Sequence, residues 1–492
     1  MTTQPISKSD LTWLNMDEPT NLMVVTGLMW FQGEPDWQQV REVVQERLVE
    51  RYSVMSSRAR KAGGTWMWEP DPDFDLDRHI RETTLPAPGD RAAAADYVSG
   101  RISQPLDRKH PLWEFDFITG YVNEDGEPGS LIMARFHHVL ADGIRIVQLI
   151  LGMCDIEGDV APPAVGRKGG PANPVAMATG AAKGVAGNAA SFAKDAATAA
   201  LRAVPQIPGK VVGLRPDSFY KGYEWAVKPT QVTDAVSALS SQDNTALNSW
   251  RSASRLALWG HESRLVADQA PGVEKQVGWV SGLDLDQVKA VGAAHNATVN
   301  DVLLAAVSLG LTEYLHQRDR AVPSDTNFLI PISLKPIDMS LPKELGNHFA
   351  MVMFPMPLGL VNIDALLIEI RERMARIKNS AEAMMVFGVQ RAVAEAPQTI
   401  GKNLTRFVAN KSVGLLTNVP GPRAPIFLAG HEVAGVLGWV PTASDQSIGL
   451  CIFSYNGQVN IGIATDAGII PDPDHLGECI QAGFAEMVAT TS

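Results

Sequence analysis

The stretch 131-LIMARFHHVLADG-143 decides the fold expected of this chain. Residues 131–138 are apolar on both faces and are bounded on each side by turn-forming Gly, Pro and Asp residues, so they predict a buried strand. Successive side chains of a strand point to opposite faces, which gives His137 and His138 different surroundings. One histidine can therefore face a cavity as a base while the other packs as a hydrogen-bonded core residue.

The strand is followed at a fixed distance by Asp142-Gly143, which predicts a tight turn. The short carboxylate of Asp142 can fix the local backbone or pair with a nearby arginine that the sequence does not identify. A lone buried histidine is more often a packing residue, but an adjacent pair followed by Asp-Gly rarely arises by chance. The pattern therefore favours a catalytic interpretation.

Composition and charge limit the classes of function. The 492 residues are too many for one ordinary core, and 45% hydrophobic with 20% charged residues is typical of a globular protein. A formal net charge of −12 argues against a nucleic-acid-binding surface. The three cysteines, Cys154, Cys451 and Cys479, have no CxxC spacing and suit a reducing cytosol. We find neither a signal peptide nor a long apolar run, so we expect a cytoplasmic protein whose membrane contact is peripheral.

Strands and helices alternate in two stretches that a connector separates. Apolar periodicity predicts strands over 24–31, 113–122, 277–283, 327–333, 348–356, 412–417, 447–455 and 458–465, and helices after Asp36, over 91–103, 285–295, 298 onward, 364–380 and from Asp474. From about residue 160 a run rich in Pro and Gly, then in Ala, interrupts this pattern. We expect an α/β chain of three parts: a domain over 1–160, a connector with a crossover helix over 161–245, and a domain over 246–492.

Residues 175–229 differ in charge from the rest of the chain. Seven basic residues (Lys183, Lys194, Arg202, Lys210, Arg215, Lys221, Lys228) stand against three acidic ones (Asp195, Asp217, Glu224), so the balance is 7 − 3 = +4 in an acidic protein. A solvated crossover between domains explains this charge, and so does a surface that approaches anionic lipid.

The motif HHVLADG resembles the HHxxxDG signature of the acyltransferase superfamily that includes chloramphenicol acetyltransferase, plant BAHD enzymes and peptide-synthetase condensation domains. The surrounding sequence is similar to the bacterial wax ester synthase/diacylglycerol acyltransferase family, with PLW at 111–113, Asn300-Asp301 and NVPGP at 418–422 in the family's order. The first hundred residues match less distinctively. Residues 21–25 read NLMVV where many relatives have a Pro-Met-His stretch, which puts the shape of the nearby substrate channel in doubt.

The resemblance implies two chloramphenicol-acetyltransferase-like domains, each a mixed sheet flanked by helices, around an inter-domain substrate tunnel. It also implies that His138 is the general base, that His137 packs away from it, and that Asp142 and Gly143 shape the loop that aims the imidazole. Weaker candidates for substrate binding or structural support, including the oxyanion donor, are Asn300, Asp301, Asn418, Pro420 and Gly421. Thr298 and Asp301 have the spacing of a helix capping box, so Asp301 has a structural explanation that can hold together with the functional one.

The implied reaction moves a long-chain acyl group from acyl-CoA to the hydroxyl of diacylglycerol or of a long-chain fatty alcohol. It needs no cofactor and no metal, and the enzyme would work at the inner membrane face and on lipid inclusions without any nucleic acid partner. No GxSxG, Walker A, Rossmann or HExxH motif occurs, so direct transfer is preferred to a serine acyl-enzyme. The alternatives are a related acyltransferase with another lipid or polyketide acceptor, and an inactive condensation-like binding or scaffold protein.

Overall fold

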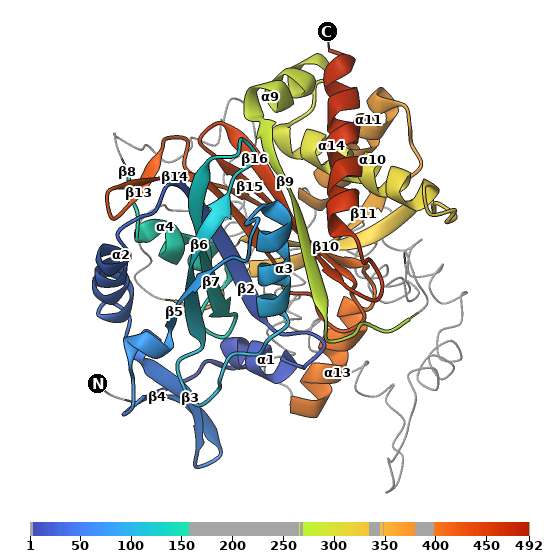
Figure 1. Cartoon of the computed structure of the whole chain (residues 1–492). Helices are drawn as coiled ribbons and strands as arrows, with labels where there is room; N and C mark the ends of the chain where they lie inside the picture. The colour runs from blue at the N-terminus through green and yellow to red at the C-terminus, as the bar shows by residue number, and fades with distance from the viewer. Residues whose placement is uncertain are drawn as a thin grey trace, which may run out of the picture.

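The fold is known from a computed structural model, which describes residues 3–156, 265, 269–333, 345–347, 349–378 and 398–491. The expected connector and its basic segment 175–229 lie outside the described residues. Two mixed sheets carry the architecture, with helices packed against them (Figure 1). The expected α/β fold with two mixed sheets is confirmed, whereas the boundaries of the three parts stay a prediction.

The first sheet has seven strands and is built around the histidine stretch. Its order is β5 (Ile80–Thr84), β6 (Trp113–Val122), β7 (Pro128–His137), β2 (Val24–Gln32), β14 (His431–Trp439), β13 (Ile426–Leu428) and β8 (Asp155–Ile156). All neighbours pair antiparallel except β5 and β6. The strand β7 is an interior strand between β6 and β2, and its apolar side chains are buried on both faces, as a continuous apolar run requires.

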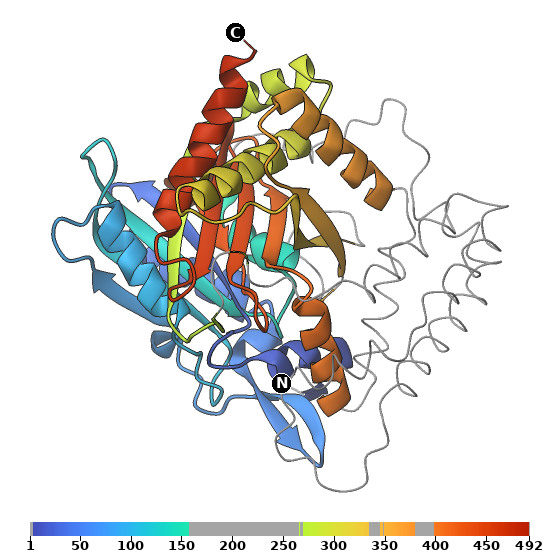
Figure 2. The same ribbon diagram turned by 90° about the vertical axis from the view of Figure 1, so that its right-hand side faces the viewer.

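The second sheet has six strands in the order β11 (Phe349–Pro357), β10 (Asp325–Ser333), β12 (Gly414–Pro420), β15 (Ile448–Tyr455), β16 (Gln458–Asp466) and β9 (Lys275–Asp284). Its outer face is covered by α9 (Leu285–Ala294), α10 (Val299–His316), α11 (Ile363–Lys378) and α14 (Pro473–Ala489), which lie together on one side of the strands (Figure 2). The apolar faces of these helices and of the strands form one core. This layer gives the second half its own hydrophobic centre.

The remaining elements belong mostly to the first half. A small sheet joins β1 (Gln4–Pro5), β4 (Thr65–Pro70) and β3 (Ser57–Ala62), and the helices are α1 (Lys8–Met16), α2 (Trp37–Val44), α3 (Arg91–Ile102), α4 (Gly143–Gly152) and α13 (Gln398–Ala409). Helices α1 and α13 lie side by side although almost 400 residues separate them in the sequence (Figures 1 and 2). Glu18, just after α1, forms ion pairs with Lys402 (2.6 Å) and Arg406 of α13.

Two features join the halves. First, β14 comes from the second half of the sequence but pairs with β2, and its backbone crosses close to that of β16. A Cβ on Gly462 would lie 2.0 Å from the carbonyl oxygen of Gly438, so only glycine permits this approach. Second, β9 is an edge strand whose amides at Lys275 and Val277 donate to the hydroxyls of Ser103 and Ser99, at the end of α3 and within it. The serines satisfy backbone donors that an edge strand leaves open.

The expected elements agree closely with the observed ones, and the differences fall at the histidine stretch and between the halves. The strand ends at His137 rather than His138, because His138 begins the turn toward α4. The Asp-Gly pair starts a ten-residue helix instead of making only a tight turn. The sequence also did not reveal that β13 and β14 complete the first sheet, because strand pairing over 400 residues leaves no local signal.

Candidate active site

His138 lies where β7 ends, at the junction of the two halves. Its backbone amide donates to the carbonyl oxygen of Met23, 2.8 Å away, at the start of the neighbouring strand β2. From the second half, the segment 345–347 closes over the motif: the amide of Asp142 donates to the carbonyl oxygen of Gly346 at 3.2 Å. The histidine motif is therefore held by hydrogen bonds to the start of β2 in its own sheet and to the segment 345–347 of the other half.

The imidazole of His138 packs between aromatic rings and one amide. It stacks on Trp13 of α1 with ring centroids 4.1 Å apart and planes 16° apart, and it lies 6.0 Å from the ring of Phe349. Its Nδ1 is 3.1 Å from the side-chain oxygen of Asn347. The side chain is buried, with 7% of its surface exposed, so the ring sits in an environment that excludes most water.

This environment keeps the imidazole neutral. Burial lowers the pKa of His138 to about 4, although the charge of Asp142 and the contact with Asn347 act in the opposite direction. A neutral imidazole has a lone pair available for a proton at physiological pH. The arrangement can therefore serve a general base in a dry site.

His137 has a different environment, as the sequence predicts. Its Nδ1 accepts a hydrogen bond from the backbone amide of Val139 at 3.0 Å, and its Nε2 lies 3.6 Å from Oδ2 of Asp17. Burial alone would raise the pKa of Asp17, but His137 and Arg108 lower it to about 2. Because the backbone occupies the Nδ1 lone pair, His137 fits a structural role.

The same face of β7 continues as a buried ionic network. Arg135 has an exposed fraction of 1%, and its Nη1 lies 2.8 Å from Oε2 of Glu114. Arg101 of α3 reaches the same carboxylate at 2.5 Å and Asp116 at 2.6 Å. These groups neutralise one another and tie α3 to the sheet, so the buried charges beside β7 are paired with one another.

Asp142 acts as the N-cap of α4. Its Oδ1 accepts a hydrogen bond from the backbone amide of Arg145 at 2.9 Å, and the side chain is buried. Gly143 is the first residue of the helix, and a Cβ at this position would meet no atom within 4 Å. The backbone does not demand glycine here, so the glycine leaves open space beside the motif.

The weaker candidate residues meet in the second half. The side-chain amide of Asn418, in β12, donates to Oδ1 of Asn300 at the start of α10, 3.1 Å away. Asp301 forms the expected capping box with Thr298, accepting from its backbone amide at 2.9 Å and donating its own amide to the hydroxyl at 3.3 Å. The structural explanation of Asp301 therefore holds, and the two separate motifs are in contact.

The end of β12 is shaped by close packing. Pro420 is exposed, whereas Gly421 donates its amide to Ser454 at 2.8 Å, and a Cβ there would lie 2.4 Å from the Ser454 carbonyl oxygen. Among the described residues, the contacts of His138 come from Trp13, Met23, Asn347 and Phe349 rather than from this loop. An oxyanion donor at Asn300 or in the loop 418–422 thus stays a prediction.

Four residues of this site were not identified from the sequence: Trp13, Asn347 and Phe349, which contact His138, and Asp10, which contacts Asn347. The side-chain NH2 of Asn347 donates to Oδ1 of Asp10 at 2.7 Å and to the carbonyl oxygen of His138 at 3.0 Å. Asp10 and Trp13 are three residues apart on α1 and so share a face of that helix. The run Leu345-Gly346-Asn347 was visible as a loop between strands, but nothing local connects it to the histidine.

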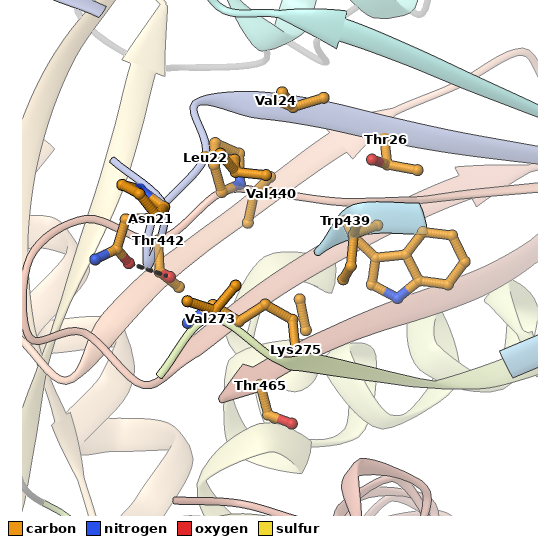
Figure 3. Close-up of a pocket in the computed structure, with 14 residues that line it drawn as sticks. Asn21, Leu22, Val24, Thr26, Val273, Lys275, Trp439, Val440, Thr442 and Thr465 are labelled. Atoms are coloured by element: carbon orange, nitrogen blue, oxygen red, sulfur yellow. Dashed lines mark hydrogen bonds between the residues drawn. The ribbon is translucent and has the colours of Figure 1, made fainter. Parts of the chain in front are cut away.

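A pocket opens between the two sheets, lined in part by side chains of β2 (Figure 3). Val24 and Thr26 line it, and their cross-strand partners are His137 and Arg135, so the pocket lies on the His137 face of the first sheet. On its rim the hydroxyl of Thr442 donates to Oδ1 of Asn21 at 3.2 Å (Figure 3). The chain at 22–24 thus separates this pocket from the ring of His138.

Within the described part of the chain, no group of three or more His, Cys, Asp or Glu side chains could hold a metal ion. The three cysteines are buried and unpaired, and burial raises the pKa of Cys154 and of Cys451 to about 12, so neither thiol is activated. In the same part of the chain, every helix is too short or too polar to cross a membrane.

The two mixed sheets with flanking helices have the fold of solved condensation and acyltransferase domains. The fold matches the first condensation domain of the calcium-dependent antibiotic synthetase with a TM-score of 0.58 at 11% identity, over 99% of this chain and 97% of that one. It matches the wax ester synthase/diacylglycerol acyltransferase of Marinobacter aquaeolei VT8 with a TM-score of 0.65 at 19% identity, over 99% of both chains.

The sequence comparisons identify the family. The model of the wax ester synthase/diacylglycerol acyltransferase catalytic domain matches residues 6–303, and the model of the WS/DGAT C-terminal domain matches residues 345–488. The chain therefore belongs to the wax ester synthase/diacylglycerol acyltransferase family of O-acyltransferases. It is 24% identical to a probable diacylglycerol O-acyltransferase of Mycobacterium tuberculosis, over 87% of this chain and 82% of the relative. It is 23% identical to the O-acyltransferase WSD of Acinetobacter baylyi, over 97% and 96%.

Proposed function

We propose that this enzyme transfers a long-chain acyl group from acyl-CoA to the hydroxyl of diacylglycerol or a long-chain fatty alcohol, with His138 as the general base. The observation that carries the proposal is the buried, neutral imidazole at the junction of the halves. The named activities of the relatives in Mycobacterium tuberculosis and Acinetobacter baylyi support the same reaction class.

In the proposed reaction, His138 takes the proton of the acceptor hydroxyl as its oxygen attacks the thioester carbonyl. The C–S bond breaks when the tetrahedral intermediate collapses, and the coenzyme A thiolate leaves with the proton that the imidazolium returns. Trp13 and Phe349 keep water from the ring, which protects the thioester from hydrolysis. Acyl-CoA is a substrate here, and the proposal requires neither a resident cofactor nor a metal. The two substrates would enter a tunnel between the halves from opposite sides.

The test is release of free thiol from palmitoyl-CoA by the full chain, measured over a panel of acceptors. We expect release to depend on added diacylglycerol, monoacylglycerol or long-chain alcohol, with the ester product identified by mass spectrometry. Release of the same size without an acceptor would make the protein a thioesterase. Release that requires only a short or polyketide acceptor would favour the alternative of a related acyltransferase.

We further propose that the enzyme works at a lipid surface, at the inner membrane face and on lipid inclusions. Each buried methylene is worth about 0.8 kcal/mol, so a triacylglycerol or wax ester has to leave into a lipid phase. The basic segment 175–229 would supply electrostatic attraction that falls with salt. The test is co-sedimentation with anionic vesicles of a Lys183→Gln, Lys194→Gln, Arg202→Gln, Lys210→Gln variant at low and high salt. Binding equal to that of the parent under both conditions would remove the segment from the proposal.

A further inference from the structure

The amide of Asn347 can lie in only one orientation. Its Nδ2 faces Oδ1 of Asp10 at 2.7 Å and the backbone carbonyl oxygen of His138 at 3.0 Å. A carboxylate and a carbonyl oxygen can only accept hydrogen bonds, so the NH2 group has to point toward them. The side-chain oxygen of Asn347 is then the atom that faces Nδ1 of His138, 3.1 Å away.

This orientation decides which nitrogen of His138 carries the hydrogen. An amide oxygen accepts and cannot donate, so Nδ1 of the imidazole has to be the N–H donor. A neutral imidazole has one N–H, and burial keeps this ring neutral by lowering the pKa of His138 to about 4. The lone pair is then left on Nε2.

We propose that Asp10 and Asn347 are positioning residues that hold His138 in the Nδ1–H tautomer and so make Nε2 the atom that receives the acceptor's proton. The inference rests on the proposed function of His138 and adds the residues that make its base competent. Neither residue needs to touch substrate, because each acts through the imidazole.

The hydrogen-bonded chain Asp10–Asn347–His138, which we call the relay, is assembled from both halves of the molecule. Asp10 comes from α1, where its Oδ2 accepts from the hydroxyl of Ser7 at 2.5 Å, and its Oδ1 also accepts the backbone amide of Asn347 at 3.1 Å. Trp13, on the same face of α1, stacks on the ring and fixes its plane. The base is therefore in its working form only when α1 and the segment 345–347 are both docked on the histidine motif.

The discriminating variant is Asp10→Asn, which keeps size and removes the acceptor-only group. In Asp10→Asn only the carbonyl oxygen of His138 still requires the NH2 group of Asn347, because an asparagine at position 10 can donate as well as accept. The Asn347 amide can then turn over at a lower cost and present its NH2 to Nδ1, which stabilises the wrong tautomer. We expect kcat to fall by about 10- to 100-fold, by analogy with the loss found when the hydrogen-bond partner of a metal-bound histidine is removed. Asn347→Ala should have an effect of similar size.

The tautomer of His138 is the measurement that separates the proposal from a purely structural role, because a loss of stability alone would not change which ring nitrogen carries the hydrogen. In ¹⁵N-histidine-labelled full-length protein at neutral pH, we expect Nδ1 of His138 to be protonated and Nε2 unprotonated, with the signal assigned by its loss in His138→Gln. In Asp10→Asn and Asn347→Ala the Nε2–H form should appear. Asp286→Asn is the matched control, since Asp286 lies in the first turn of α9, where its carboxylate forms an ion pair with Lys289. It should change neither the tautomer of His138 nor kcat.

Protonated Nε2 in the wild type would overturn the inference, as would variants in which kcat falls and the tautomer does not change. A changed tautomer with full activity would also overturn it, because the base would then not depend on the relay. The spectrum needs no substrate. A wild-type protein that shows the Nδ1–H form but transfers no acyl group would therefore contradict the proposed function and leave the tautomer assignment intact.

Discussion

The two sides of the end of strand β7 surround neighbouring histidines in opposite ways. On one side, His137 accepts a backbone hydrogen bond at Nδ1 and faces Asp17, with the paired charges of Arg135 and Glu114 next along the strand. On the other, His138 meets aromatic rings and the neutral amide of Asn347. Residues of the same type, one position apart, thus have different chemistry because one lone pair is occupied by the backbone and the other is kept available in a dry site.

The two sides also differ in how they are built. The contacts of His137 come from the first half, from Asp17, which also pairs with Arg108, and the network on α3 lies further along the same face. Beyond them, residues of both halves line the pocket on this face. The side of His138 requires Asn347 and Phe349 from the second half. A fold that brings two halves together around one histidine can therefore couple the formation of the site to the docking of the halves.

The largest expected effect that separates the two sides is on activity. His138→Ala should lower kcat/KM for acyl transfer by roughly 10²- to 10⁴-fold, the loss expected for a general base, with the fold retained by circular dichroism. His137→Ala is the matched control: it leaves the amide of Val139 unpaired, so it should cost about 1–3 kcal/mol in the free energy of unfolding and much less activity. A folded His138→Ala with normal turnover, or the reverse ranking of the two variants, would show that the sides are assigned wrongly.

The pH dependence of kcat/KM in the wild-type enzyme tests whether His138 lies in the dry environment that distinguishes its side of β7. Burial lowers the pKa of His138 to about 4, so the charged form becomes the major one only below that pH and the base should stay active well into the acid range. A histidine with the ordinary pKa of about 6.5 would lose about 30-fold in kcat/KM at pH 5, whereas His138 should lose less than twofold. The measurement is kcat/KM between pH 4.5 and 8 with stability checked at each pH. An acid limb near 6.5 would mean that the ring is more hydrated than the structure indicates.

The sequence predicted those parts of this site that depend on residues close together in the chain. The apolar run with flanking turns predicted β7, the period of two predicted different surroundings for the two histidines, and the Thr298–Asp301 spacing predicted the capping box. The start of α4 was missed because Asp142-Gly143 is equally typical of a turn and of a helix start. Local sequence patterns therefore predict which strands and helices form, whereas short ambiguous patterns do not determine where each one begins or ends.

The partners of His138 could not be predicted, because they are set by tertiary structure. Asp10 and Asn347 are 337 residues apart, and their hydrogen bonds depend on how α1 and the segment 345–347 dock. The pairing of β14 with β2 joins residues about 400 positions apart, and β14 also passes close to β16 where Gly438 faces Gly462. One sequence shows that these residues exist and does not show that they meet.

The smallest expected effect concerns Asp142, which lies between the two sides and has two separable roles. Its side chain caps α4 through the amide of Arg145, so Asp142→Ala should cost about 1 kcal/mol in the free energy of unfolding, whereas Asp142→Asn keeps a capping group and should cost little. Burial is the main cause of the low pKa of His138, and the charge of Asp142 opposes it. Removing that charge in Asp142→Asn should therefore lower the pKa further and shift the acid limb to lower pH, leaving activity at neutral pH unchanged, because the base is already deprotonated there. Urea unfolding and kcat/KM at pH 7 measure the two roles separately. If Asp142→Asn is as stable as the wild type but loses activity at pH 7, the carboxylate stabilises the imidazolium that forms in the transition state, and the cap is only part of its role.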